Sequence, residues 1–296
     1  MSDFVRRFLF ESLDIRGAIV HLGKSWRQMQ EGRAYPPPVA QLLGEMAAVT
    51  ALIAAQLKQP GRLTLQLRSG GPIQLLVMDC DEQLQMRGMA RSDPTVLPAP
   101  VPQLLGANLG ASLGTEQDGQ LLMSLDLPTA RQPWQSFVPL VGDSIAAIFE
   151  HYLEQSEQQP SRLFAAASPE AAACLFLQKM PAADARDADG WPRLSQLAAT
   201  VKAEELLELD PETLLTRLFH QDIADHGLRL YDPRPVAYHC PEDWDKIRDM
   251  IRALGRAEAE AILAEQGEIL IRDDICNREY RFSADDMAAL FAGTLH

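Results

Sequence analysis

The chain has 296 residues, an apolar fraction of 47% and a formal charge of -14. This length accommodates one large core and a smaller module, and the negative charge disfavours nucleic acid as a partner. The amino-terminal segment lacks a signal-peptide core, and no run approaches the ~20 apolar residues of a membrane span. Because the four cysteines are also too scattered for a secreted disulfide framework, we expect a cytoplasmic protein without a membrane partner.

Residues 1–180 are predicted to form one domain with an α+β fold. Alternating apolar residues predict strands at 14–22, 62–68, 73–78, 84–90 and 120–127. The second and third of these strands flank the turn Ser69–Pro72 and are expected to form an antiparallel hairpin. Apolar periodicity predicts helices at 39–57 and 142–155. Strands and helices without a regular βαβ rhythm favour α+β over a doubly wound sheet.

Residues 181–235 are interpreted as a helical linker. The segment 181–190 is small, polar and acidic, and Asp210 followed by Pro211 is a typical helix start. The apolar residues of 194–219 can pack on the N-terminal sheet, or they can cover a binding surface until they are released. The two interpretations are compatible, because a metastable cover must bury the surface that it later exposes.

Residues 236–296 are predicted to form a small C-terminal module. It comprises, in chain order, a helix at 241–254 ended by Gly255, a helix at 256–265, a hairpin around 273–277 and a last helix opened by Ser283. The first helix carries one predicted apolar stripe, made of Trp244, Ile247, Met250, Ile251 and Leu254. A module with so small a core usually needs a metal or a disulfide, which directs attention to Cys240 and Cys276.

Short segments along nearly the whole chain resemble those of one known family, in the same order and at similar spacing. They include Asp14–Gly17, Leu42–Glu45, Arg87–Ala90 and Val138–Ala146, the last followed by His151 and Tyr152. On these segments the chain resembles the 33 kDa chaperonin family of redox-regulated chaperones.

The resemblance implies a cytoplasmic, ATP-independent holdase that binds unfolded client proteins and is not an enzyme. In the family the reduced, zinc-bound protein is inactive. Oxidation forms disulfides, ejects zinc and unfolds the C-terminal module and the linker, which exposes apolar surface, often with homodimerisation. This is physically consistent, because the free energy of metal binding in such a module is its folding free energy.

The zinc motif of the family is a Cys-x-Cys pair followed by a Cys-x-x-Cys pair. At the matching positions this chain has Cys240, Glu242, Asp273 and Cys276, so that two of the four cysteines are replaced by acids. Three interpretations remain open. The four residues bind zinc through two thiolates and two carboxylates, with His239 as an alternative ligand; or Cys240 and Cys276 form one disulfide; or the switch is lost and the module folds by packing alone.

Other features are interpreted as structural. Cys80 and Cys174 lie in apolar surroundings and are expected to be buried and inert. The glycine-rich stretch 105–114 lacks the context of a dinucleotide loop, so no nucleotide cofactor is expected.

Two alternative functions remain. One is an adaptor protein that is constitutive or heat-triggered, has no redox switch and delivers a specific partner. The other is a thiol enzyme using Cys240 or Cys276, which would need positive charge near the thiol. The mixed charges around both cysteines do not favour an enzyme.

Overall fold

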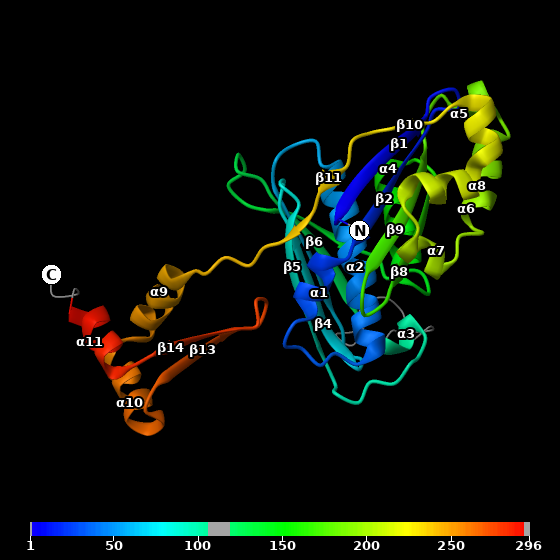
Figure 1. The fold of residues 1–296 in the computed structure, drawn as a ribbon. Coiled ribbons are helices and arrows are strands. Elements are labelled where there is room, and N and C mark those ends of the chain that lie inside the picture. Colours follow the sequence, from blue (N-terminus) through cyan, green and yellow to red (C-terminus); the bar gives the residue numbers. More distant parts are fainter. Residues whose placement is uncertain (1, 106–118, 293–296) are drawn as a thin grey trace. The chain divides into compact units, whose positions relative to one another are not determined.

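The computed structural model describes residues 2–105 and 119–292, so the glycine-rich stretch 105–114 lies, apart from Leu105, outside the described residues. The chain divides into two compact units, Met1–His239 and Cys240–His296 (Figure 1). Strands and helices are mixed in the first unit, which confirms the predicted α+β class.

One sheet of the first unit, here called sheet A, has the order β10-β1-β2-β9-β8, with β11 also pairing with β1. Its strands are β1 (Phe4–Phe10), β2 (Ile15–Leu22), β8 (Ser161–Ala167), β9 (Ala172–Lys179), β10 (Arg229–Leu230) and β11 (Arg234–Pro235). Strand β2 confirms the predicted strand at 14–22. Strand β9 was not predicted, because nearly all its residues are buried and its sequence therefore does not alternate.

The second sheet of this unit, sheet B, has the order β12-β5-β4-β3-β6-β7. Its strands are β3 (Arg62–Arg68), β4 (Ile73–Cys80), β5 (Gln85–Ser92), β6 (Gln120–Asp126), β7 (Trp134–Val138) and β12 (Ala237–Tyr238). The predicted hairpin is confirmed, with Leu65 opposite Met78 in the β3–β4 pair. Strand β3 alternates strictly between buried and exposed positions, so its sequence was easy to interpret.

Helix α2 (Pro37–Gln56) contacts strands of both sheets and forms the centre of the main core. The smaller helices around it are α1 (Lys24–Gln30), α3 (Val101–Leu104) and α4 (Ile145–Glu157). Within the described residues α2 is the one helix long and apolar enough to cross a membrane, which corrects the expectation that no run approaches that length. The most apolar stretch of α2 is 89% buried within the protein, as expected of a helix in the core of a domain.

The segment predicted as a linker lies in the first unit. It contains α5 (Ala183–Arg186), α6 (Gly190–Ala198), α7 (Ala203–Glu208) and α8 (Pro211–His226). Asp210 caps α8 as predicted, accepting a hydrogen bond from the Thr213 amide at 3.0 Å. The segment belongs to this unit because its leucines pack against sheet A.

The second unit begins at Cys240, close to the boundary predicted at 236. It contains α9 (Trp244–Leu254), α10 (Arg256–Gln266), β13 (Ile269–Asp273), β14 (Arg278–Phe282) and α11 (Ala284–Ala292). Ile247 and Ile251 of the predicted stripe are buried in its core. Met250 and Leu254 are 53% and 49% exposed, because the core is too small to cover the flank and the end of α9.

Candidate disulfide centre and helical cover

The turn between β13 and β14 positions one of the two cysteines. Asp273 Oδ1 accepts hydrogen bonds from the amides of Ile275 at 2.9 Å and Cys276 at 3.2 Å, which closes the turn after β13. Asn277 then adopts a positive φ of 51°, a conformation that asparagine tolerates better than most residues. The Asp273 carboxylate therefore acts as a turn-forming acceptor and fixes the backbone of Cys276.

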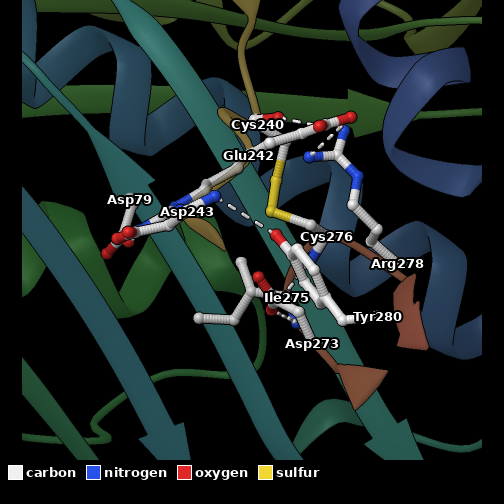
Figure 2. Close-up of a disulfide and its surroundings, with 10 residues drawn as sticks. Asp79, Cys240, Glu242, Asp243, Asp273, Ile275, Cys276, Arg278 and Tyr280 are labelled. Carbon is white, nitrogen blue, oxygen red and sulfur yellow. Dashed lines mark hydrogen bonds and ion pairs between the residues drawn. A yellow bond between two sulfur atoms is a disulfide. The ribbon is translucent and has the colours of Figure 1, made fainter. Parts of the chain in front are cut away.

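Cys240 lies before α9 and is joined to Cys276 by a disulfide (Figure 2). The two Cα atoms are 5.8 Å apart, within the range typical of disulfides. Both residues are only partly buried, so small oxidants and reductants can reach the sulfur atoms. The structure thus brings together the two cysteines that the motif comparison singled out.

Arg278, two residues after Cys276, connects the two sides of this centre. Its Nη2 donates a hydrogen bond to the Cys240 carbonyl at 3.3 Å, and its Nη1 lies 3.7 Å from Glu242 Oε1. Glu242 Oε2 also accepts a hydrogen bond from Trp244 Nε1 at 2.9 Å. In the sequence, Arg278 is only one of the mixed charges around the two cysteines. Its place on β14, beside the cysteine turn, is the feature that could have indicated this bridging role.

The residues matched to the zinc motif do not fit a four-ligand site in this form. The two sulfur atoms are bonded to each other, whereas zinc requires thiolates. Asp273 accepts hydrogen bonds from its own turn, and Glu242 pairs with Arg278. In the two described stretches of chain, no group of three or more His, Cys, Asp or Glu side chains is arranged to hold a metal ion. His239, the alternative ligand, directly precedes Cys240 and is exposed.

A small aromatic core supports the disulfide centre. Tyr280 is buried, and Trp244 packs edge-on against it with ring centroids 4.8 Å apart. The Tyr280 hydroxyl accepts a hydrogen bond from the Asp243 amide at 3.3 Å (Figure 2). These contacts attach the start of α9 to β14 next to the covalent link.

Helices α6 to α8 form what we call the helical cover, residues 190–226. Its buried residues Leu194, Leu206, Leu214, Leu215, Leu218 and Phe219 face Phe8, Phe10, Ile15, Ile19, Leu175 and Leu177 of sheet A. Phe219 packs edge-on against Phe10 at 5.6 Å between ring centroids. Burial of such side chains stabilises by about 1.5–3 kcal/mol each. Because these side chains are buried between the cover and sheet A, release of the cover would expose a large apolar surface. Figure 1 shows α6, α7 and α8 as separate helices of the first unit.

Two polar links join the cover to sheet A, and a third joins two helices within the cover. His21 Nε2 lies 3.1 Å from the Leu207 carbonyl oxygen. Arg6 on β1 pairs with Glu212 on α8 at 2.5 Å. Arg193 on α6 donates a hydrogen bond to the buried carboxylate of Asp222 on α8 at 2.9 Å. Apolar packing therefore holds the cover on sheet A, and the polar links fix the positions of its helices.

Cys80 and Cys174 belong to the first unit. Both are buried, as predicted. Burial raises the pKa of the Cys80 thiol to about 12 and raises that of Cys174 further. Such thiols remain protonated at neutral pH and react slowly.

Comparison with known proteins agrees with this arrangement. Residues 3–283 match the family described as Hsp33 protein. The chain is 39% identical to the 33 kDa chaperonin of Azotobacter vinelandii, over 98% of this chain and 95% of that protein. It is 38% identical to the 33 kDa chaperonin of Pseudomonas aeruginosa, over 99% and 95%.

Among solved structures, the fold is similar to that of the 33 kDa chaperonin from Thermotoga maritima. The TM-score is 0.79, with 20% identity over 99% of this chain and 98% of that one. A family match across most of the sequence, together with full-length relatives above a third identity, establishes the relationship. The chain belongs to the Hsp33 family of 33 kDa chaperonins.

Proposed function

We propose that this chaperone is an ATP-independent holdase that binds cytoplasmic proteins as they unfold and prevents their aggregation. The observation that carries the proposal is the helical cover, whose apolar face is buried on sheet A. When the cover detaches, both apolar faces become available to unfolded clients, which expose similar surfaces. Holding a client by apolar contact needs no nucleotide. Self-association of the exposed faces would give the homodimer that we expect of the active state.

We further propose that Cys240 and Cys276 form a two-cysteine redox element in place of the zinc site. The disulfide closes a loop with a sequence separation of 36 and braces the second unit, whose core is small. In a zinc-bound module, oxidation ejects the metal and so removes what holds the module folded. Here the folded second unit contains the disulfide, so oxidation of the two cysteines does not unfold it. Reduction is then the change that loosens this unit.

The test is light scattering from a heat-unfolding enzyme, with the reduced and the disulfide-bonded protein compared and no ATP added. We expect suppression of aggregation at roughly stoichiometric amounts, beginning when the cover detaches. Phe219→Ala removes a buried ring of the cover, at a cost of about 3–5 kcal/mol, and should lower the temperature at which suppression begins. Met250→Ala, at an exposed position of α9, is the matched control. No suppression by any form at any temperature would disprove the proposal.

The second candidate is an adaptor that delivers one specific partner without a redox switch. The replacement of two family cysteines by Glu242 and Asp273, both engaged in other contacts, favours it. An adaptor would retain one defined partner in pull-down experiments. It would bind that partner equally well before and after oxidation. A holdase would instead bind many unfolding proteins and leave folded ones in solution.

A further inference from the structure

A cavity of about 450 Å³ lies against sheet A, where α2 ends. Strands β1, β2 and β9 contribute Arg7, Arg16 and Phe176 to its lining, and Gln56 lines it from the last position of α2. Tyr231, which follows β10, completes one side, and its amide donates a hydrogen bond to the Arg7 carbonyl at 2.9 Å. All these residues belong to the first unit. The volume and the mixed apolar and polar lining are typical of small-molecule sites.

Three polar groups in the lining have no hydrogen-bond partner among residues 2–105 and 119–292. They are the guanidinium of Arg7, the side-chain amide of Gln56 and the hydroxyl of Tyr231. The Arg7 guanidinium lies over the Tyr231 ring, 5.6 Å from its centroid. Cation–π packing of this kind fixes the plane of the guanidinium and leaves its N–H groups able to bind an anion.

The charged groups of the lining are unequally compensated. Arg16 donates to Gln178 at 2.7 Å and lies 3.5 Å from the Glu157 carboxylate. Asp14 accepts a hydrogen bond from the Ala182 amide at 3.0 Å. Of the two arginines that line the cavity, Arg7 has no oppositely charged partner in the described part of the chain, whereas Arg16 pairs with Glu157. In a protein with a formal charge of -14, this cavity presents an available positive charge beside aromatic surface.

We propose that the cavity binds a small aromatic anion, a flat apolar ring system that carries one phosphate or carboxylate group. The anionic group pairs with Arg7, for which a planar two-oxygen acceptor is the best match. The ring system packs against Leu9 and Met180, the partly buried apolar side chains that line the cavity. Gln56 and the Tyr231 hydroxyl supply further hydrogen bonds at the rim. The cavity is lined by residues of the first unit alone and by none of the disulfide centre.

The experiment is a titration of the full-length, disulfide-bonded protein with 1-naphthyl phosphate, in which isothermal titration calorimetry measures the heat of binding. Neutral 1-naphthol and inorganic phosphate serve as probes of each half of the ligand. Arg7→Gln removes the available charge and Tyr231→Leu removes the ring beneath it. Arg162→Gln is the matched control, because Arg162 is an exposed arginine of the same sheet that pairs with Glu150, outside the cavity.

We expect saturable binding of 1-naphthyl phosphate to the native protein and to the Arg162→Gln variant with the same Kd. The Arg7→Gln variant should bind at least about tenfold more weakly, as loss of a charge-assisted pair implies. Each half-ligand should also bind at least about tenfold more weakly than the whole. The proposal is overturned by equal affinity in the Arg7→Gln variant, by 1-naphthol binding as well as its phosphate, or by no saturable binding. Circular dichroism confirms that each variant is folded.

Discussion

His21 on β2 donates a hydrogen bond from Nε2 to the carbonyl oxygen of Leu207 on α7, across 3.1 Å. Because a carbonyl can only accept, the ring must carry its proton on Nε2. Its Nδ1 is then unprotonated, and it is buried without a partner in the described parts of the chain. Burial lowers the pKa of His21, although the Leu207 hydrogen bond and the charge of Asp3 act to raise it. A neutral histidine therefore links sheet A to the helical cover.

This relationship predicts a loss of stability in mild acid. Below the ordinary histidine pKa of about 6.5, the unfolded chain binds a proton that folded His21 does not. Stability of the cover should therefore fall as the pH decreases from that value to the lowered folded pKa, and then stay level. Hydrogen exchange of the α7 amides at pH 7.5 and 5.5 would measure it.

The His21→Gln variant is the informative comparison for this pH effect. Glutamine retains an N–H donor for the Leu207 carbonyl but does not titrate, so protection of α7 should no longer depend on pH in this window. His220→Gln, at an exposed position of α8, should behave like the native protein. The same pH dependence in the His21→Gln variant would show that another group is responsible.

Arg193 should hold the helical cover together through Asp222. Arg193→Met leaves a carboxylate that is 3% exposed without its cation, at an expected cost of about 1–3 kcal/mol. Urea unfolding of the first unit should show this loss, and holdase activity should begin at a lower temperature. In Arg229→Met, the lost pair with Glu11 is more than half exposed on both sides, so a change of about 0–1 kcal/mol is expected. Equal losses in both variants would contradict the assigned role.

Reduction should loosen the second unit selectively. Closure of a loop with a sequence separation of 36 is worth about 3–4 kcal/mol in the chain-entropy account. Dithiothreitol should therefore speed hydrogen exchange in residues 241–292 and leave the amides of α2 protected. The Cys240→Ser, Cys276→Ser double variant should exchange quickly with or without reductant. If reductant leaves exchange of the native second unit unchanged, the disulfide does not brace it.

Metal content is the fourth prediction. The reduced native protein should hold far less than one zinc per chain after dialysis, because Glu242 and Asp273 already have other partners. The Glu242→Cys, Asp273→Cys double variant supplies four thiolates and should retain close to one zinc per chain when reduced. Plasma mass spectrometry measures both. Stoichiometric zinc in the native reduced protein would restore the mixed-ligand interpretation.

Much of the fold could be predicted where local sequence and burial agree. Strand β3 alternates because one face is buried, and α8 begins at Asp210 and Pro211 because these residues cap a helix. Strand β9 was not predicted, since its residues are buried on both faces and lack a period of two. Strand β1 was not predicted, since Arg6 and Arg7 interrupt its apolar residues. Cys240 and Cys276 were identified from the family motif. Their separation in the sequence gives no distance, which depends on how β13 and β14 pair.

The parts of the candidate site that were not foreseen depend on side-chain partners. Glu242 and Asp273 were considered as zinc ligands because they replace cysteines at matching positions. The actual acceptor roles of these carboxylates follow from Arg278 and from the turn amides, which only the folded chain brings near. The contact between His21 and Leu207 joins residues far apart in the chain, and no periodic pattern indicates it.

The position of the disulfide has a mechanical consequence. Cys240 is the first residue of the second unit, so a chain pulled from its amino end meets a covalent crosslink where that unit begins. Tension then bypasses residues 241–275 and passes through the sulfur atoms to Cys276. At about 3.4 Å per residue, the bond withholds roughly 120 Å of contour length from an unfoldase or an optical trap. The oxidation state of the protein thus sets how far its carboxyl-terminal part can be extended by force.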